Sequence, residues 1–461
     1  MLENLKSVYI IGIGGISMSA LAYFLHARGI KIFGSDISFN SEIEKLVKDN
    51  IIDYKQGYAP EFVKICDAVI YTAAVSQDNS DILLAEKLGK SILSRAEVLG
   101  ELSKNKKTIS IAGTHGKTTT TGLISAMLLA NGLNPNIHIG GILKNINSNV
   151  NVSESDILVT EACEYKDSFL SLKNYISIVL NIKPDHLDYF KNIDNEFVSF
   201  QKFVDNTDDN GFLIINNDDK LSRLLKTHCK KITFAINNYA DLQAKDIKID
   251  NKAHISFNLH LKGENLGNVE LPCYGYHNIY NVLACAAVAV ALSIPFDKFK
   301  CGIKSFKGIA RRFEIIYKEK NTLIVHDYAH HPDEIKATLS LCRSLGYKKL
   351  VAIFQPHTFS RTRDLYNQFL NCFDQADEVC FLPIYPAREK PIKGITSYKL
   401  SKDINNKIND LKDKNCKLKK AKYLNNFVKC KDYIEKYCEN DVLFAILGAG
   451  DIVELAYNLK K

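Results

Sequence analysis

The sequence predicts an α/β protein of about three domains built on parallel sheets. A chain of 461 residues is too long for one hydrophobic core, and typical domain sizes give about three domains. Strand-like and helix-like segments alternate from end to end, which is typical of parallel sheets covered by helices. Two strand-to-helix turns are rich in glycine, at 12–15 and 113–116. Hydrophobic residues make up 46% and charged residues 24% of the chain, as in ordinary soluble globular proteins.

The first predicted domain spans residues 1–106. Its expected elements are strands at 8–12, 31–35 and 68–72 and a helix at 17–28. The second of these strands ends at Asp36. A charged break at 103–107 precedes the next apolar strand and sets the first boundary.

The second predicted domain spans residues 107–312 and the third spans 313–461, with the boundary at the pair Arg311–Arg312. In the second we expect strands at 157–160, 176–181 and 212–216, antiparallel strands or a hairpin around 247–261, and an apolar helix at 281–292. In the third we expect strands at 323–327, 350–355, 378–382 and 442–447 and helices at 334–345 and 361–373.

The composition indicates a protein of the cytoplasm. The net charge is +8, but the basic residues are dispersed, and the densest run, 412–422, is better explained as a solvated surface than as a nucleic-acid patch. The 12 cysteines occur singly, without C-x-x-C pairs or zinc-type spacing, which indicates reduced thiols. We expect no targeting segment before the first strand. We also expect no membrane span, since no apolar run reaches about 20 residues.

The stretch 108–121, TISIAGTHGKTTTT, predicts a site for the phosphates of a nucleoside triphosphate. An apolar strand turns through glycines into Lys117 and Thr118 at the start of a helix. Backbone N–H groups and the helix dipole face the anion there, the lysine adds a charge, and the threonine offers a hydroxyl to Mg²⁺. The strict pattern G-x-x-x-x-G-K-[ST] fails, because its first glycine would fall on Ile111, so the loop is a shortened relative. The alternative is a chance Gly-Lys-Thr in a surface turn.

Polar side chains follow the next strands of this domain. Glu161 follows one strand and His186 follows another, with Asp185 and Asp188 beside it. The carboxyl ends of parallel strands meet at one sheet edge, so these groups and Thr118 are placed to share one or two Mg²⁺ ions with the phosphates. Taken singly, Glu161 is equally well explained as a helix cap and His186 as a loop histidine.

The glycine turn at 12–17 predicts a second anion site, with Asp36 at the end of the following strand. A dinucleotide fingerprint would have glycine at position 17, where this chain has Ser17. An NAD-dependent oxidoreductase is therefore the weaker interpretation. The turn still suits the diphosphate of a nucleotide-like substrate.

Histidines and arginines gather after the strands of the third domain, in HDYAHHP at 326–332 and QPHTFSRTR at 355–363. Arginines there are suited to clamp phosphates and carboxylates. The pair His330–His331 lacks a third ligand at usable spacing, which argues against a metal site. In the second domain, HNIYN at 277–281 opens the apolar helix, where Asn278 is either an N-cap or a contact for an adenine edge.

These motifs together resemble the Mur ligase family. The resemblance rests on GTHGKTTT from Gly113, HNIYN from His277, DYAHHP from Asp327 and QPHTFSRT from Gln355, and matches extend from position 12 to position 451. It implies a Rossmann-like N-terminal domain for a UDP-sugar and a central P-loop-type ATPase domain with a mostly parallel sheet. It also implies a C-terminal Rossmann-like α/β domain that binds ATP and an amino acid.

The resemblance also implies roles for single residues. Catalytic roles fall to Lys117, His186, His330 and Arg361, with His357 in the same region as the last two. The implied ATP-binding residues are Gly113, Thr114, His115, Gly116, Lys117, Thr118, Thr119, Asn278, Asn281, Arg312 and Asp327. The implied UDP-sugar-binding residues are Gly14, Gly15, Ser35, Asp36, Thr72, Ala73 and Val75. The implied metal ligands are Thr118, Glu161 and His186.

The chain departs from the family's common E-A-D-E-S-D form after Glu161, where Cys163 and Tyr165 replace polar residues. Only Glu161 is carried over from that motif, and Cys163 receives no role.

The implied reaction is ATP-driven amide bond formation between UDP-N-acetylmuramate and L-alanine through an acyl phosphate, with ATP and Mg²⁺ as cofactors. It belongs to peptidoglycan precursor biosynthesis, and so to cell-wall biogenesis, cell shape, cell division and the cell cycle. The nearest alternative is a peptide-recycling ligase that joins a tripeptide to the same UDP-sugar, and a non-enzymatic nucleotide switch lies outside the family. We expect a cytoplasmic monomer or weak homodimer with no nucleic-acid or membrane partner.

Overall fold

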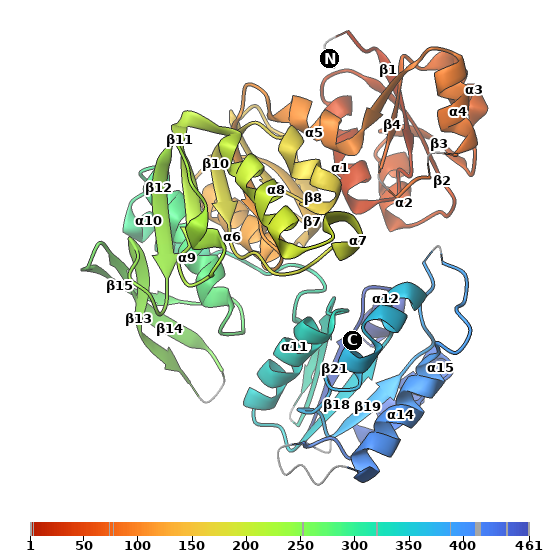
Figure 1. Cartoon of the computed structure of the whole chain (residues 1–461), viewed down its shortest axis with the longest axis vertical. Coiled ribbons are helices and arrows are strands. Elements are labelled where there is room, and N and C mark those ends of the chain that lie inside the picture. The colour runs from red at the N-terminus through yellow and green to blue at the C-terminus, as the bar shows by residue number, and fades with distance from the viewer. Residues whose placement is uncertain are drawn as a thin grey trace. The chain divides into compact units, whose positions relative to one another are not determined.

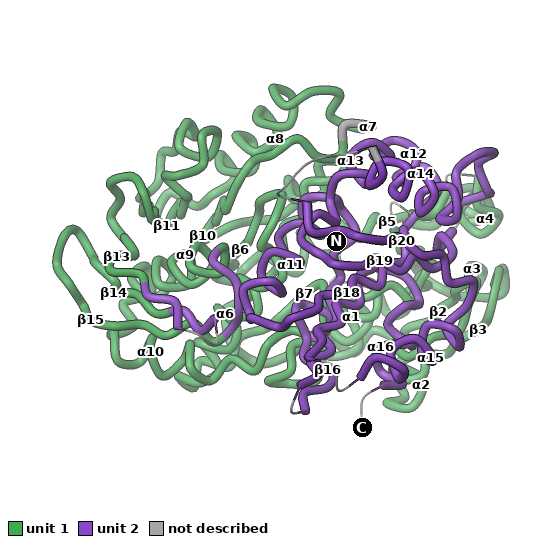
Figure 2. Tube along the Cα trace, turned by 90° about the horizontal axis from the view of Figure 1, so that it is seen from below, with its two compact units in different colours: residues 1–247, 256–272, 277–309 green, residues 248–255, 273–276, 310–461 purple. Residues whose placement is uncertain are grey.

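The computed structural model describes residues 2, 4–72, 74–76, 78–250, 253–319, 321–387, 389–410, 416–438 and 441–459. The chain forms two compact units, drawn in different colours in Figure 2. The first contains residues 1–247, 256–272 and 277–309, and the second contains 248–255, 273–276 and 310–461. No helix in the described ranges is long and apolar enough to cross a membrane.

The first unit begins with a five-stranded parallel sheet of order β3-β2-β1-β4-β5 (Figure 1). Side chains of its central strand alternate between two cores, since Val8 and Ile10 join one cluster and Tyr9 and Ile11 join the other. The chain reverses direction across the sheet between β1 and β4, the position where open α/β sheets bind ligands. The elements are β1 (Ser7–Ile11), α1 (Ile16–His26), β2 (Lys31–Asp36), α2 (Ser41–Lys48), β3 (Ile52–Gln56), α3 (Pro60–Ile65), β4 (Ala68–Tyr71), α4 (Ser80–Lys87), β5 (Ser91–Ser94) and α5 (Arg95–Ser103).

A second sheet of the first unit has ten strands in the order β15-β14-β13-β12-β11-β10-β6-β9-β7-β8. Strand β6 lies near its middle and pairs in parallel with β10 and β9, whereas β8 and β15 pair antiparallel at the two edges. The strands are β6 (Lys107–Ala112), β7 (Asn136–Leu143), β8 (Ser148–Asn151), β9 (Ile157–Glu161), β10 (Asn174–Val179), β11 (Thr207–Asn216), β12 (Lys230–Ala235), β13 (Leu242–Ile249), β14 (Ile255–Leu261) and β15 (Glu264–Glu270). The helices are α6 (Lys117–Ala130), η1 (Tyr165–Ser171), α7 (Leu187–Phe190), α8 (Ile193–Asp205), η2 (Ser222–Leu224), α9 (Asn278–Ala291) and α10 (Phe296–Lys304).

Helix α6 is almost wholly buried, because two helices from much later in the chain pack against it. It contacts both α9 and α10. Small residues allow the close approach: a Cβ on Gly302 would lie 2.7 Å from Cγ of Met127, and a Cβ on Gly122 would lie 3.1 Å from the ring of Phe306. The helix that starts at the phosphate loop is therefore held in place by segments about 150 or more residues later in the chain.

The second unit is a six-stranded sheet of order β16-β17-β21-β18-β19-β20, parallel except for the β16–β17 pair. Val325 and Ile324, neighbours in β17, enter separate cores on the two faces of the sheet. The elements are β16 (Glu314–Glu319), β17 (Thr322–Asp327), α11 (Pro332–Ser344), β18 (Lys349–Phe354), α12 (Phe359–Asp364), α13 (Tyr366–Phe369), β19 (Glu378–Phe381), α14 (Ser397–Asp410), β20 (Lys420–Tyr423), α15 (Phe427–Tyr437), β21 (Val442–Leu447) and α16 (Ile452–Asn458).

The predicted fold class is confirmed, with mostly parallel sheets in all three predicted segments. The strand at 442–447 matches β21 residue for residue. One helix prediction is wrong: the segment 361–373 contains two short helices, α12 and α13, which are separated at Leu365 with φ −105° and ψ 16°. The segments 248–255 and 273–276, inside the predicted central range, pack with the second unit.

Candidate active site

The phosphate loop after β6 needs glycine at two positions. Gly113 has a φ of 136° and Gly116 a φ of 91°, in the left-handed region that other residues rarely adopt. A Cβ on Gly116 would also lie 2.7 Å from Oδ1 of Asn281. Gly116 is the N-cap of α6, so the free N–H groups of that helix begin at the loop. Such a loop can accept an anion.

The loop is anchored to the segment that follows β10. The backbone N–H of Thr114 donates to the carbonyl of Asn181 at 3.1 Å, and the His115 N–H donates to Oδ1 of Asn181 at 2.9 Å. The Thr114 hydroxyl donates to the carbonyl of Lys183 at 3.2 Å. In the first turn of α6, Thr118 is buried and Thr119 is half-buried. These bonds to the segment after β10 fix the geometry of the loop.

Lys117 is paired with a carboxylate that the sequence reasoning did not single out. Its Nζ lies 3.0 Å from both oxygens of Glu164, which is 1% exposed. Nζ also donates to the carbonyl of Thr114 at 3.3 Å. Burial alone would lower the pKa of Lys117, but the adjacent Glu164 carboxylate outweighs it and raises the pKa. The lysine is therefore charged, and its contacts with Glu164 and Thr114 hold it against the phosphate loop.

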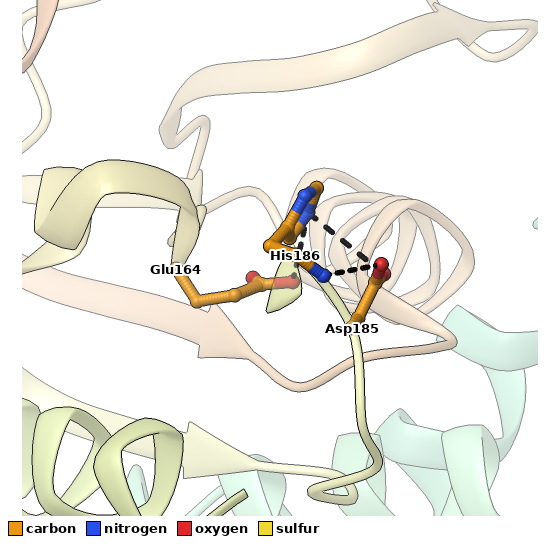
Figure 3. A group of neighbouring side chains, drawn as sticks. All are labelled: Glu164, Asp185 and His186. Carbon is orange, nitrogen blue, oxygen red and sulfur yellow. Dashed lines mark hydrogen bonds and ion pairs between the residues drawn. The ribbon is translucent and has the colours of Figure 1, made fainter. Parts of the chain in front are cut away.

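Glu164, the partner of Lys117, and Asp185 and His186 form one cluster. The three side chains point toward one another in Figure 3. Their ligand atoms lie within 4.8 Å of one another. Nε2 of His186 is 3.9 Å from Glu164 and 3.8 Å from Asp185. His186 has a left-handed φ of 50°, and the ring of Tyr165 packs against its imidazole at 4.7 Å. Two carboxylates and an imidazole are a donor set that fits a divalent cation.

A buried glutamate lies behind this cluster. Glu196 is fully buried on α8, and its Oε2 accepts the backbone N–H of Asp185 at 3.3 Å. Burial raises the pKa of Glu196 to about 7. The side chain supports the turn that presents Asp185 and His186.

Glu161 lies at the end of β9, as expected, but its carboxylate faces another strand. Its Oε1 accepts the backbone N–H of Gly140 on β7 at 2.6 Å. Within the described residues, the three-ligand cluster contains Glu164 in place of Glu161. The second glutamate of the E-A-C-E segment was visible in the sequence, but nothing in the pattern separated it from its neighbours.

The HNIYN motif joins the start of α9 to α6. Nδ2 of Asn281 donates to Oδ1 of Asn278 at 2.7 Å, and the hydroxyl of Thr120 donates to Oδ1 of Asn281 at 3.1 Å. Both asparagines are buried. Because Asn281 also touches Gly116, the predicted adenine-site residues lie next to the phosphate loop.

In the N-terminal sheet, the structure brings together Gly14 and Asp36. The Gly14 N–H donates to Oδ2 of Asp36 at 3.0 Å. Ser35 is buried, and its hydroxyl lies 2.6 Å from the hydroxyl of Tyr9. The exposed Gly15 is the N-cap of α1, and its N–H donates to the carbonyl of Gly12 at 3.2 Å.

The Thr72 loop flanks the same glycine turn. A Cβ on Gly12 would lie 3.5 Å from Cγ2 of Thr72 and 3.8 Å from Cγ2 of Val75. Ala73 lies outside the described residues. The predicted UDP-sugar residues Thr72 and Val75 therefore line the glycine turn that connects β1 to α1.

In the second unit, Asp327 ends β17 and organises the backbone around it. Its carboxylate accepts the N–H groups of Phe313 and Ala329, each at 2.8 Å. Burial raises the pKa of Asp327 to about 6, although the charge of Arg312 opposes this. The guanidinium of Arg312 lies 5.3 Å from the centre of the Tyr328 ring.

Two histidines and an arginine of the same unit form a second group. The rings of His330 and His357 are 6.3 Å apart, and Arg361 Nη1 lies 3.1 Å from Nδ1 of His357. Burial, reinforced by Arg361, lowers the pKa of His357 to about 4, and burial also lowers the pKa of His330. Both imidazoles are therefore neutral at pH 7, and the arginine is the cation of the group.

Family models match three consecutive segments of the chain. They are "Mur ligase family, catalytic domain" at residues 7–107, "Mur ligase middle domain" at 111–289 and "Mur ligase, glutamate ligase domain" at 311–450. A relative in Clostridium acetobutylicum, UDP-N-acetylmuramate–L-alanine ligase, is 42% identical over 454 residues, which covers 98% of this chain and 96% of the relative. The chain belongs to the Mur ligase family.

Further relatives and solved structures support this family assignment. The UDP-N-acetylmuramate–L-alanine ligase of Caldanaerobacter subterraneus is 42% identical over 460 residues, covering 98% of this chain and 97% of the relative. Among solved structures, the Mur ligase MurC of Thermotoga maritima, a UDP-N-acetylmuramate–alanine ligase, superposes with a TM-score of 0.83 at 25% identity, covering 99% of this chain and 98% of that one. A murein peptide ligase of Psychrobacter arcticus shares the fold, with a TM-score of 0.70 at 21% identity and 98% of each chain covered.

Proposed function

We propose that this Mur ligase joins L-alanine to UDP-N-acetylmuramate in an ATP-dependent reaction of peptidoglycan precursor synthesis. The observation that carries the proposal is the charged Lys117 beside Glu164, Asp185 and His186 at the phosphate loop. It occurs in a chain 39–42% identical, over 98–100% of its length, to relatives that bear this name.

The reaction makes a poor electrophile reactive. The muramoyl carboxylate attacks the γ-phosphate of ATP, forming an acyl phosphate and releasing ADP. The amine of L-alanine then attacks the acyl carbon, and the tetrahedral intermediate collapses with loss of inorganic phosphate. Lys117 binds the phosphates after it leaves Glu164, and the N–H groups in the first turn of α6 bind the same oxygens.

Glu164, Asp185 and His186, together with the Thr118 hydroxyl, would hold Mg²⁺. The ion supplies charge neutralisation for the transferring phosphoryl group when it is bound. Glu161 stays a proposed ligand from the family resemblance, and its bond to Gly140 fixes the end of β9.

The remaining site assignments are part of the proposal. The turn at Gly14, Gly15, Ser35 and Asp36, with Thr72, Ala73 and Val75, takes the UDP-sugar. Asn278, Asn281, Arg312 and Asp327 contact the nucleotide, and His330, His357 and Arg361 orient the carboxylate and the amino acid. Because His330 and His357 are neutral, Arg361 supplies the positive charge there.

The proposed domains are 1–106 for the UDP-sugar, 107–312 for ATP and 313–461 for the amino acid. We also propose a cytoplasmic location and a monomer or weak homodimer, with no nucleic-acid or membrane partner.

A panel of amine acceptors tests the function. The protein is incubated with ATP, Mg²⁺ and UDP-N-acetylmuramate, and ADP release is measured with L-alanine, glycine, L-serine or a murein tripeptide as acceptor. L-Alanine should give the highest kcat/KM, and Lys117→Ala should abolish the acceptor-dependent rate. Preference for the tripeptide would instead identify a peptide-recycling ligase, and turnover without any acceptor would indicate a nucleotide switch.

A further inference from the structure

A buried histidine connects the glycine turn of the N-terminal sheet to the sheet that carries the phosphate loop. His138 lies on β7 and is 3% exposed. Its Nε2 is 2.7 Å from the hydroxyl of Ser17, in the first turn of α1, and its Nδ1 is 3.0 Å from the hydroxyl of Thr160 on β9. None of the motifs found in the sequence includes His138.

The neighbouring hydrogen bonds determine which way the protons point. The Thr160 hydroxyl donates to the carbonyl of Glu161 at 3.1 Å, so it accepts from His138 and Nδ1 carries the proton. Nε2 is then an acceptor, and it receives the hydroxyl proton of Ser17. Nη1 of Arg95 donates to the oxygen of Ser17 at 3.2 Å. The result is one continuous chain of donors and acceptors, from Arg95 through Ser17, His138 and Thr160 to the Glu161 carbonyl.

This hydrogen-bond chain requires a neutral imidazole at His138, and the surroundings of the ring keep it neutral. Burial, reinforced by the charge of Arg95, lowers the pKa of His138 to about 3. A neutral ring with one donor and one acceptor is satisfied at both nitrogens, which favours a single orientation of the side chain.

The two ends of this hydrogen-bond chain lie beside the two sites whose relative position the reaction depends on. Ser17 follows the turn containing Gly14 and Gly15. Thr160 pairs with Ser110 on β6, the strand that leads into the phosphate loop. A second contact strengthens the link, since Nδ2 of Asn149 on β8 donates to the carbonyl of Ile16.

We propose that His138 is a positioning residue for phosphoryl transfer, which fixes the UDP-sugar turn relative to the phosphate loop through Ser17 and Thr160. This inference rests on the proposed function. The carboxylate of a substrate held at the turn must meet the γ-phosphate at near-attack distance, and a displacement of about 1 Å can cost about 100-fold in rate.

Two amide variants of His138 test its hydrogen bonds to Ser17 and Thr160 separately. In His138→Asn the side-chain amide reaches the position of Nδ1, so only the bond to Thr160 is retained. In His138→Gln the amide reaches the position of Nε2, so the bond to Ser17 is retained. Ser17→Ala breaks the same link from the other side. Ser177→Ala is a matched control, because it removes a buried hydroxyl pair of the same sheet, 2.7 Å from Thr207.

We expect His138→Asn and Ser17→Ala to lower kcat about 10- to 100-fold, with KM for ATP changed less than about twofold. His138→Gln should recover most of kcat, because the backbone pairing of β7 with β9 at His138 and Thr160 remains and the bond to Ser17 is the one that ties the glycine turn to this sheet. The double variant Ser17→Ala/His138→Asn should be no slower than either single variant, because both substitutions break the same hydrogen bond, between Ser17 and His138. Ser177→Ala should lower the melting temperature while leaving kcat within about twofold.

Three results would overturn the inference: kcat of folded His138→Asn within about twofold of wild type, multiplicative losses in the double variant, or equal losses in the Asn and Gln variants. The imidazole ¹⁵N spectrum gives a readout independent of activity and of variant folding. It should show a neutral His138 protonated at Nδ1, and an Nε2-protonated or charged ring would contradict the chain. Absence of alanine-dependent turnover in the wild type, with the Nδ1 tautomer present, would instead count against the proposed function.

Discussion

Replacing Glu164 by glutamine should strengthen the binding of ATP in the absence of magnesium. Both Glu164 oxygens hold the ammonium of Lys117 at 3.0 Å. Lys117 must leave this carboxylate to reach the phosphates. Glutamine keeps the size of the side chain and removes its charge, so the lysine is released toward the loop.

The magnitude follows from the geometry. Two unit charges 3.0 Å apart attract by about 5.5 kcal/mol at an effective dielectric constant of about 20. Much of this is regained when the ammonium meets the phosphates. The part that nucleotide binding must overcome is the net value of a hydrogen bond between charged groups, about 1.5–3 kcal/mol. Removing it should tighten metal-free binding by at least about tenfold.

The assay is isothermal titration with a non-hydrolysable ATP analogue, in EDTA and again with Mg²⁺. Asp185→Asn is the matched control, because it removes a carboxylate from the same cluster, and no contact of Asp185 with Lys117 occurs among the described residues. Glu164→Gln should bind more tightly in EDTA and gain less from Mg²⁺, whereas Asp185→Asn should only gain less from Mg²⁺. A metal-free affinity of Glu164→Gln equal to or below that of the wild type would contradict a restraining role of Glu164 on Lys117.

Three further predictions concern other parts of the site. Gly116→Ala should lower the melting temperature and abolish nucleotide binding. The φ of 91° is strained for alanine, and its Cβ would lie 2.7 Å from Oδ1 of Asn281. A variant that melts and binds nucleotide like the wild type would contradict this. Burial raises the pKa of Asp327 from 3.8 to about 6, so the wild type should lose stability relative to Asp327→Asn as the pH rises from about 4 through 6; parallel denaturation midpoints across this range would exclude it. Glu389→Gln should lower kcat about tenfold, since the carboxylate accepts the Ser360 N–H at 2.8 Å and fixes the loop that presents the arginine–histidine group; unchanged steady-state kinetics would show that the loop holds its shape alone.

The sequence was sufficient to locate the phosphate loop and the sheet edge at which the site is built. Glycine, lysine and threonine at 113–118 encode that turn locally, because the conformation depends on residues that are neighbours in the chain. Asp185 and His186 were found in the same way, since they follow a recognisable apolar strand. Their meeting at one edge is a consequence of parallel strands.

Contacts between distant segments were not predictable in this way. Glu161 and Glu164 are both acidic and lie three positions apart, and only the fold shows that one bonds to Gly140 while the other pairs with Lys117. His138 looks like any residue of an apolar strand, because its partners are far along the chain in both directions. The break at Leu365 interrupts a segment whose apolar periodicity favours one continuous helix.

The late return of α9 and α10 onto α6 has a consequence for synthesis on the ribosome. The phosphate loop is translated early. Asn281, which lies against Gly116, and helix α10, which packs on Met127, are translated much later and are complete only at Lys304. At about 5–20 residues per second, translation from Lys117 to Lys304 takes roughly 10–40 s. During that interval the apolar face of α6 has no α9 or α10 to cover it. The nascent chain therefore exposes the largely apolar helix α6 for roughly 10–40 s, which favours its capture by a chaperone.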